Sequence, residues 1–522
     1  MTAPLESKSN LRWWLAPAVI AGVYFTLHML TATRYGYFRD ALYYLACSEH
    51  LDWGYVDQPP LIVLIAWIAR HTLGTSLRAL LFWPALAGAG RILLIASFAR
   101  ELGAQRFGTA LAATLAAVPG VWWAIDHQFA MNAFEPLFWT GCALALLRLI
   151  RTGNPRLWLV FGAIAGLGLE NKYSIAVFTG ALLIGLLLTT ERKLLFTPWL
   201  LAGGAVALLF FLPNLVWNIQ HQWPFLELMH NIHANGEYIT LPPTAFLLQQ
   251  ILIMNPLSLP FWLGGLWFYL FRVEGREYRT FGWAFVITLG FFLAAHGKNY
   301  YCAPAYPMLL AGGALLAEKL LSGARWSAQQ RLSLAFKHAC FVLPAAGVLA
   351  FLPLVIPVLP LDSYLRYQGR LPFGIPHPEH SSDGAILPQH YADEFGWEDL
   401  AATVAQVYYS LPENERSKVA IFTNNFGEAG AIDFFGPKYG LPKAICANQS
   451  YFLWGPRNYT GEIVIRVGSS VEDVQASYDS VTVAANMNHP YSLSLEKRPI
   501  LLCRGLKGNL QALWPMVKDW RD

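Results

Sequence analysis

Apolar runs of about 20 residues, the length that a helix needs to cross a bilayer, recur through the first 360 residues and constrain the fold most. The chain is 55% hydrophobic and only 13% charged. A soluble protein carries about 25% charged residues. We therefore predict a polytopic all-α membrane domain.

The apolar pattern predicts about 11 to 13 transmembrane helices. The stretch 60–73 is apolar but short and contains Arg70 and His71, so we expect a helix that lies in the membrane interface. The expected spans are 12–32, 79–99, 107–124, 130–150, 156–170, 173–190, 196–217, 246–271, 280–296, 302–321 and 336–358.

Basic residues lie in every second predicted loop, for example Arg192-Lys193 and Arg272, Arg276 and Arg279. The alternate loops have few, and the loop 218–245 contains no Lys or Arg. Cytoplasmic loops are the ones enriched in Lys and Arg. We therefore expect a multi-pass membrane protein with a cytoplasmic N-terminus. An odd number of spans then places the C-terminal domain outside the cytoplasm.

A second domain is predicted after Pro360, where hydropathy falls. Short β-type runs at 418–422, 462–467 and 499–503 alternate with helical runs at 397–410 and 428–435. This pattern predicts a C-terminal extracytoplasmic α/β domain over 361–522, after a membrane domain over 1–360. Cys446 and Cys503 both fall in it, so a disulfide and a pair of inert cysteines are both open interpretations.

The first outer loop, 33–78, carries charge where the chain otherwise avoids it. Arg39 and Asp40 follow two tyrosines, and Asp57 precedes Gln58-Pro59-Pro60. We interpret this loop as the centre of an active site. Two simpler interpretations stay open: Asp40 could only pair with Arg39, and Asp57 could only cap the helix that follows it.

Further polar residues lie in or beside the predicted spans, where an ionisable group costs about 2.5–3.5 kcal/mol. The predicted topology places them all on the outer face, which indicates an extracytoplasmic cleft. Glu135-Pro136 could instead stabilise a kink, Lys172 and Lys298 could be interface anchors, and His221 could be an ordinary loop residue. The candidates are Asp126, His127, Asn132, Glu135, Lys172, Asn218, His221, Lys298 and Tyr301.

These residues, in this order, resemble the bacterial GT-C glycosyltransferases of the protein-mannosyltransferase and lipid A aminoarabinose-transferase-like superfamily. The resemblance covers essentially the whole chain. Gln58 stands where the family often has Lys, and Glu135 where it has Asp. The matching stretches are Tyr37-Phe38-Arg39-Asp40, Asp57-Gln58-Pro59-Pro60, Glu135-Pro136, Asn171-Lys172, Gly297-Lys298 with Tyr301 and Pro304, and Asn425-Phe426-Gly427-Glu428 with Trp454-Gly455-Pro456.

The resemblance implies an inverting glycosyltransferase that takes a sugar from a polyprenyl-phosphate donor. It also implies a bacterial inner membrane, which would place the C-terminal domain in the periplasm. Asp40 would be the general base, with Asp57 and Glu135 as further catalytic residues that orient the acceptor. Arg39, Lys172, Lys298 and Tyr301 would bind the donor phosphate. Asp126, His127, Asn132, Asn218 and His221 would contact acceptor or sugar.

The expected partners are the lipid-linked donor, a glycolipid or protein acceptor and the bilayer, with no nucleic acid. No cofactor is required, although a divalent metal could bind at Asp57 and His221. The alternative function is a transporter or flippase of a lipid-linked sugar. Against it, the polar residues gather on one face and no internal repeat is visible, whereas transporters place such residues near the midplane.

Overall fold

The computed structural model describes residues 13–236, 240–322, 327–371, 385–493 and 497–521. The chain divides into two compact units. Unit 1 comprises Met1–Ala32, Leu81–Pro213 and Thr240–Gln368. Unit 2 joins Thr33–Leu80 and Asn214–Ile239 to Gly369–Asp522. The first outer loop is therefore part of the same compact unit as the C-terminal α/β region.

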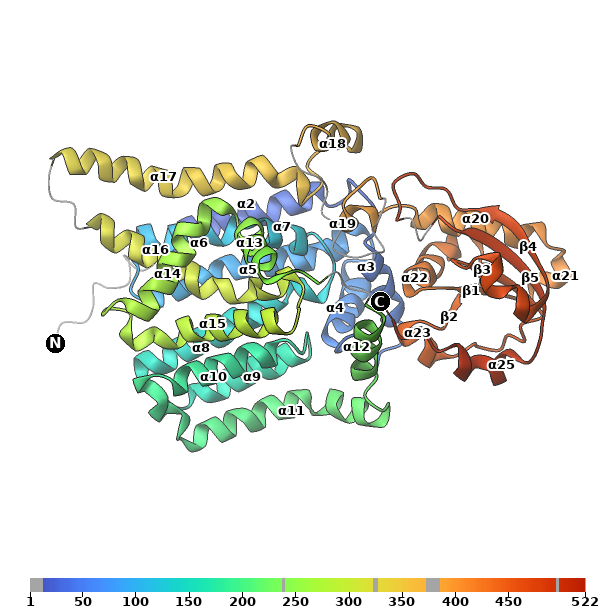
Figure 1. The fold of residues 1–522 in the computed structure, drawn as a ribbon, viewed down its shortest axis with the longest axis horizontal. Helices are drawn as coiled ribbons and strands as arrows, with labels where there is room; N and C mark the ends of the chain where they lie inside the picture. The colour runs from blue at the N-terminus through green and yellow to red at the C-terminus, as the bar shows by residue number, and fades with distance from the viewer. Residues whose placement is uncertain (1–12, 237–239, 323–326, 372–384, 494–496, 522) are drawn as a thin grey trace. The chain divides into compact units, whose positions relative to one another are not determined.

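Unit 1 is helical, and one or more helices overlap each predicted span (Figure 1). Apolar residues around each helix explain this, because a helix satisfies its own backbone hydrogen bonds where water is absent. The helices are α2 (Leu15–Thr31), α5 (Leu77–Glu101), α6 (Arg106–Ala117), α7 (Gly120–Asp126), α8 (Glu135–Thr152), α9 (Leu157–Leu169), α10 (Ile175–Leu187), α11 (Pro198–Gln220), α13 (Pro243–Ile253), α14 (Leu259–Phe271), α15 (Arg279–Ala294), α16 (Tyr306–Ser322), α17 (Ser327–Phe351) and α18 (Leu361–Gln368).

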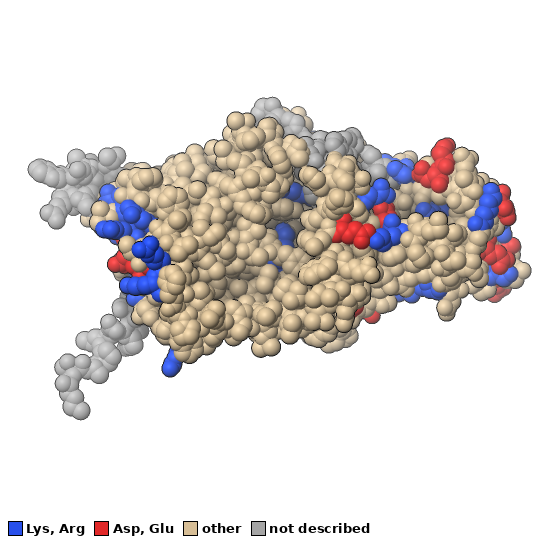
Figure 2. Space-filling model, turned by 60° about the horizontal axis from the view of Figure 1, so that its bottom comes forward, with Lys and Arg blue, Asp and Glu red and all other residues tan. Residues whose placement is uncertain are grey.

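Within the described residues, four helices are long and apolar enough to cross a membrane, or up to six if each bent pair is one span. Shorter apolar helices include α2, α9 and α10. At one end of unit 1, Lys and Arg side chains gather beside a broad uncharged surface (Figure 2). The chain is thus a multi-pass membrane protein, while the larger predicted number of crossings stays a prediction.

Two predicted spans are broken rather than straight. The axes of α6 and α7 differ by 63°, and those of α13 and α14 by 87°. Asn255 lies at the second break with a φ of 66° and is buried. Its side-chain amide donates to the carbonyls of Val118, at the first break (3.3 Å), and of Pro344, inside α17 (2.9 Å). Both breaks and α17 therefore share one hydrogen-bonding side chain.

Unit 2 contains the outer-loop helices α3 (Arg39–Cys47) and α4 (Leu61–Thr72), together with α12 (Pro224–Asn235). Helix α12 lies where the sequence predicted only a loop, and its apolar side packs Leu228 and Ile232 against Val56 and Trp520. The C-terminal elements are α19 (Gln389–Ala392), α20 (Trp397–Ser410), α21 (Glu413–Arg416), β1 (Val419–Thr423), α22 (Phe426–Phe435), β2 (Ile445–Cys446), α23 (Gln449–Trp454), β3 (Ile463–Val467), α24 (Val471–Val474), β4 (Tyr478–Asn486), β5 (Pro499–Leu506) and α25 (Leu510–Leu513).

These strands form one mixed sheet of order β2-β1-β3-β5-β4. Strand β1 runs parallel to β2 and β3, with Val419 opposite Ile463, and β5 runs antiparallel to β3 and β4. The small α/β domain expected from the sequence is thus present. Its three predicted strands are observed, and β2 and β4 were not predicted.

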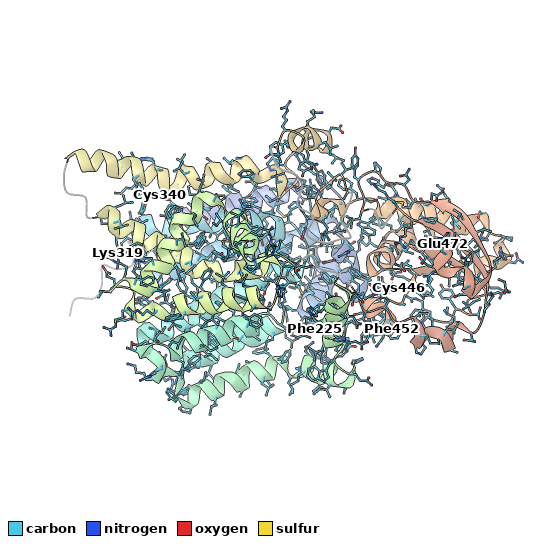
Figure 3. The ribbon with its side chains drawn as sticks, in the orientation of Figure 1. Phe225, Lys319, Cys340, Cys446, Phe452 and Glu472 are labelled. Atoms are coloured by element: carbon cyan, nitrogen blue, oxygen red, sulfur yellow. The ribbon has the colours of Figure 1, made fainter. Side chains whose placement is uncertain are left out.

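The disulfide interpretation of Cys446 and Cys503 is wrong. Cys446, labelled in Figure 3, ends β2, whereas Cys503 lies on β5, three strand positions away in the sheet. Three steps of about 4.8 Å separate the strands by about 14 Å, far beyond disulfide reach. Both cysteines are buried and free.

Candidate functional site

The predicted site residues of the outer loop start in α3. Arg39 and Asp40 occupy its first turn, where a carboxylate interacts favourably with the helix dipole. The Arg39 Nε lies 3.5 Å from the Asp40 Oδ1, so the expected ion pair is present. The guanidinium also lies 5.0 Å from the centre of the Phe426 ring. Both charged side chains remain partly exposed.

Asp57 is held by a tyrosine on the same helix. The Tyr43 hydroxyl donates to the Asp57 Oδ1 at 2.8 Å. Burial, and then the charge of Asp57, raises the pKa of Tyr43 well above its usual value, so this hydroxyl stays protonated and donates. The simpler capping interpretation of Asp57 is wrong, because α4 begins after Pro60 and has no side-chain cap. We call Arg39, Asp40, Tyr43 and Asp57 the outer-loop cluster.

The two carboxylates of this cluster also act on one buried ring. Burial raises the pKa of Tyr44 well above its usual value, and the negative charges of Asp40 and Asp57 raise it further. Asp40 and Asp57 are 17 residues apart in sequence, but the fold brings both carboxylates near Tyr44. The outer loop therefore concentrates negative charge at one place.

Asn218 and His221 lie near the end of α11, in the part that belongs to unit 2. The Asn218 amide donates to the carbonyl of Asn214 at 3.0 Å. His221 stacks on Trp217, and its Nδ1–H donates to the Trp217 carbonyl at 2.8 Å. Gly54 of the outer loop packs directly on the Trp217 ring, where a Cβ would overlap it. These residues thus support the outer loop.

A second group of predicted residues comes together in unit 1. The Lys172 ammonium lies 3.2 Å from the Glu135 carboxylate and donates to the Asn132 side-chain oxygen at 2.6 Å. It also lies 4.6 Å from the centre of the Tyr301 ring. The Ser174 hydroxyl donates to the other Glu135 oxygen. We call Asn132, Glu135, Lys172, Ser174 and Tyr301 the lysine cluster.

The lysine cluster is built from three separate segments. Glu135 begins α8, with Pro136 in the first turn, where proline is well tolerated, so this pair starts a helix rather than kinking one. Lys172 lies between α9 and α10. Tyr301 lies in the 3-10 helix Asn299–Ala305, which Lys298 immediately precedes, and its N–H donates to the Lys298 carbonyl at 3.1 Å. A partly buried cation thus lies beside one carboxylate and close to the rings of Tyr300 and Tyr301.

Asp126 and His127 are engaged in a separate buried network of unit 1. The Arg91 guanidinium lies 3.0 Å from the Asp126 carboxylate, and both side chains are almost fully buried. The Tyr24 hydroxyl donates to the same oxygen at 2.7 Å. His127 hydrogen-bonds His28 through their Nδ1 atoms at 3.2 Å. Arg91 of α5 is therefore paired with Asp126 inside the helical bundle.

Two residues that contact candidate site residues, Tyr43 and Ser174, were not predicted from the sequence. Tyr43 follows Asp40 by three positions, and residues at this spacing share one face of a helix. Once α3 is assigned, this spacing is a usable signal. Ser174 follows Lys172 by two positions outside a helix, and nothing in the sequence distinguishes it from other serines.

Among the described residues, no group of three or more His, Cys, Asp or Glu side chains could hold a metal ion. His221, proposed from the sequence as a ligand with Asp57, instead uses its Nδ1 for the Trp217 carbonyl. The residues present do not form a metal centre of ordinary composition. We therefore derive no chemical step through a metal.

The chain is similar to known glycosyltransferases in part of its sequence and in its fold. Residues 57–217 match the family model described as dolichyl-phosphate-mannose-protein mannosyltransferase. The chain is 31% identical over 199 residues to the lipid A galacturonosyltransferase RgtD of Rhizobium johnstonii. That match covers 37% of this chain and 41% of the relative, so the chain spans about two fifths of the curated relative it matches.

Solved structures show the same fold over nearly the whole chain. ArnT from Cupriavidus metallidurans bound to undecaprenyl phosphate matches with a TM-score of 0.58 and 14% identity, covering 94% of this chain and 97% of that one. The apo state of the same protein matches with a TM-score of 0.60 and 13% identity, covering 95% and 98%. The resemblance to GT-C glycosyltransferases predicted from the sequence is confirmed.

Proposed function

We propose that this protein transfers a sugar from a polyprenyl-phosphate donor to an acceptor outside the cytoplasm, either lipid A, another glycolipid or a protein. The observation that carries the proposal is the lysine cluster, which holds a partly buried cation between a carboxylate and a tyrosine ring. Two likenesses support it: the matched relative is named a lipid A galacturonosyltransferase, and the matched ArnT structure contains undecaprenyl phosphate.

In this proposal the cations bind the phosphate of the donor. A glycosyl phosphate carries its own leaving group, so catalysis must stabilise the negative charge that develops as the glycosidic bond breaks. Lys172 and Lys298 supply positive charge, with Arg39 and the Tyr301 hydroxyl as further donors. Glu135 orients Lys172 through their ion pair and would in turn face the acceptor.

Asp40 is the proposed general base. It removes the proton from the acceptor hydroxyl as that oxygen attacks the anomeric carbon, and the polyprenyl phosphate leaves from the opposite face. This single displacement inverts the anomeric configuration. Asp57, held by Tyr43, orients the acceptor. Asn132, Asn218 and His221 are further polar groups proposed to contact acceptor or sugar. We leave Asp126 and His127 out of this site, because Arg91, Tyr24 and His28 engage them.

We further propose that the protein lies in a bacterial inner membrane, with its N-terminus in the cytoplasm and its C-terminal domain in the periplasm. The uneven distribution of Lys and Arg among the predicted loops supports this orientation. Lipid-linked donors and envelope acceptors are then available to the outer loop on the same side.

The test is mass spectrometry of envelope glycolipids and glycoproteins from cells that lack the protein. The cells are complemented with wild type, Asp40→Asn or Asp52→Asn. Asp52 is a matched control, because it is an exposed aspartate of the same loop. We expect one glycan mass to disappear and to return with wild type and Asp52→Asn only.

Restoration by Asp40→Asn would contradict the role of Asp40 and favour the alternative, a transporter of a lipid-linked sugar. Purified protein separates the two functions directly. A transferase forms the new glycosidic bond in detergent, where no second compartment exists, whereas a transporter does not.

A further inference from the structure

Ser450 of the C-terminal region connects to both sides of Asp57. It lies in α23 and is buried. Its Oγ accepts a hydrogen bond from the Val56 N–H at 3.0 Å, and its own N–H donates to the Tyr43 hydroxyl at 3.1 Å. The Tyr43 hydroxyl in turn donates a hydrogen bond to the Asp57 carboxylate at 2.8 Å. The backbone before Asp57 and the carboxylate of Asp57 are therefore held through one serine.

The turn that presents Ser450 is itself fixed. Gln449 has a φ of 48°, a conformation that non-glycine residues adopt only when their surroundings impose it. Its side-chain amide donates to the Arg521 carbonyl at 2.7 Å, and the Asn448 amide donates to the Asp519 carbonyl at 2.8 Å. Trp520 donates from its ring to the Gln449 carbonyl at 3.3 Å. The last residues of the chain thus support this turn.

Aromatic packing strengthens the same attachment. Phe452, also on α23 and labelled in Figure 3, packs on Trp520 and against the apolar cluster that contains Trp520 and Val56. Ser450 is buried as well, so its hydrogen bonds lie away from water. A buried hydrogen bond that water cannot reach is held more firmly than an exposed one.

The same turn also supports Arg39. The Asn448 side-chain oxygen accepts the N–H of Phe426, at the start of α22, at 3.2 Å. The Phe426 ring contacts the Arg39 guanidinium and packs on Tyr43, with 4.8 Å between ring centres. Gly430 lets α22 approach α3 closely, since a Cβ there would lie 2.9 Å from the Leu42 carbonyl carbon.

We propose that the C-terminal domain positions the outer-loop cluster for catalysis, and that Ser450 is the positioning residue for Asp57. This inference rests on the proposed transferase function and assigns the C-terminal domain a part in it. Neither Ser450 nor Tyr43 reacts with substrate. They fix the position of the carboxylate that orients the acceptor.

The experiment compares four full-length proteins in detergent: wild type, Ser450→Ala, Tyr43→Phe and Tyr451→Phe. Tyr451→Phe is the matched control, because the buried Tyr451 hydroxyl also donates to a carboxylate, that of Asp433, at 3.0 Å. Asp433 is outside the proposed site. Hydrogen–deuterium exchange of the segment 54–60 reports on position without any need for activity. Steady-state transfer kinetics report on function, and thermal unfolding shows that each variant folds.

We expect Ser450→Ala to speed exchange of the Val56 amide about fivefold, the factor that one hydrogen bond contributes. We expect Ser450→Ala and Tyr43→Phe to raise the acceptor KM about tenfold at unchanged donor KM. Tyr451→Phe should alter neither quantity. If Ser450 and Tyr43 only stabilised the fold, Ser450→Ala and Tyr43→Phe would lower the thermal midpoint, and Tyr451→Phe would lower it as strongly.

Two results overturn the positioning role. One is unchanged exchange across 54–60 in Ser450→Ala. The other is faster exchange with wild-type kinetics in both Ser450→Ala and Tyr43→Phe. Absence of transfer by the wild-type protein overturns the proposed function instead, and the exchange result then still shows whether Ser450 holds the loop.

Discussion

The ion pair between Lys172 and Glu135 allows structure and catalysis to be separated by one pair of substitutions. Lys172→Met removes the cation but keeps an unbranched side chain of similar length. The carboxylate of Glu135 then remains buried, only 5% exposed, without its ion-pair partner. Adding Glu135→Gln removes that uncompensated charge and keeps a side-chain oxygen for the Ser174 hydroxyl.

The magnitude follows from the geometry. Two unit charges 3.2 Å apart attract by about 5 kcal/mol at an effective dielectric constant of about 20. Desolvation offsets part of this attraction, and removing one partner of a buried pair typically costs about 3–5 kcal/mol. We expect Lys172→Met to lose about 3 kcal/mol of unfolding free energy and the double variant to regain about 2 kcal/mol of it.

The assay combines unfolding by a denaturing detergent with transfer of sugar by the same preparations. Because Lys172 is the proposed phosphate ligand, the double variant should recover stability and remain at least about 100-fold less active than wild type. Glu135→Gln alone controls for the loss of the carboxylate. Recovery of transfer together with stability would refute the reasoning, because Lys172 would then only neutralise Glu135.

Three further predictions concern other parts of the molecule. Arg91→Leu should destabilise unit 1 by about 3–5 kcal/mol, since Asp126 then lies buried without a counter-charge, and thermal unfolding of this variant with and without Asp126→Asn checks this. Burial, and then Asp393, raises the pKa of Glu394 well above its usual value. Glu394 therefore loses its proton at a lower pH in the unfolded chain than in the folded protein. The free energy of unfolding then falls as pH rises above the pKa that Glu394 has in the unfolded chain. Glu394→Gln should lose less stability than wild type in thermal unfolding as pH rises above about 4. Gly430→Val should cost about 1–3 kcal/mol by forcing α22 away from α3, and should lower transfer more than a valine at the open position Gly290 does.

Much of the fold is predictable because it depends on local patterns. Apolar runs predict helices in unit 1, and β-branched runs predict β1, β3 and β5 in unit 2. Strand β4 was not predicted because most of its side chains are exposed, so it lacks the continuous apolar run that marks β1, β3 and β5. Both bends could have been predicted from the sequence. Pro119 follows Val118 and Pro256 follows Asn255, and proline disfavours a helical conformation of the residue before it.

The candidate site is predictable only in part. The charges of the outer loop and of the lysine cluster are conspicuous because a membrane domain has few of them. Their partners are not, since the pairing of Glu135 with Lys172 depends on how two distant segments pack. Ser450 has no sequence signal at all. It is an ordinary serine until the fold brings it to Tyr43 and Val56.

Asn255 makes the evolution of three helices interdependent. Its one side-chain amide serves the carbonyl of Val118 and that of Pro344, while its oxygen accepts the N–H of Leu257. A substitution that straightens either broken span would leave a hydrogen-bonding group of another helix without its partner. Mutations near these three positions should therefore combine non-additively, and a tolerated change in one helix should require a compensating change in the others.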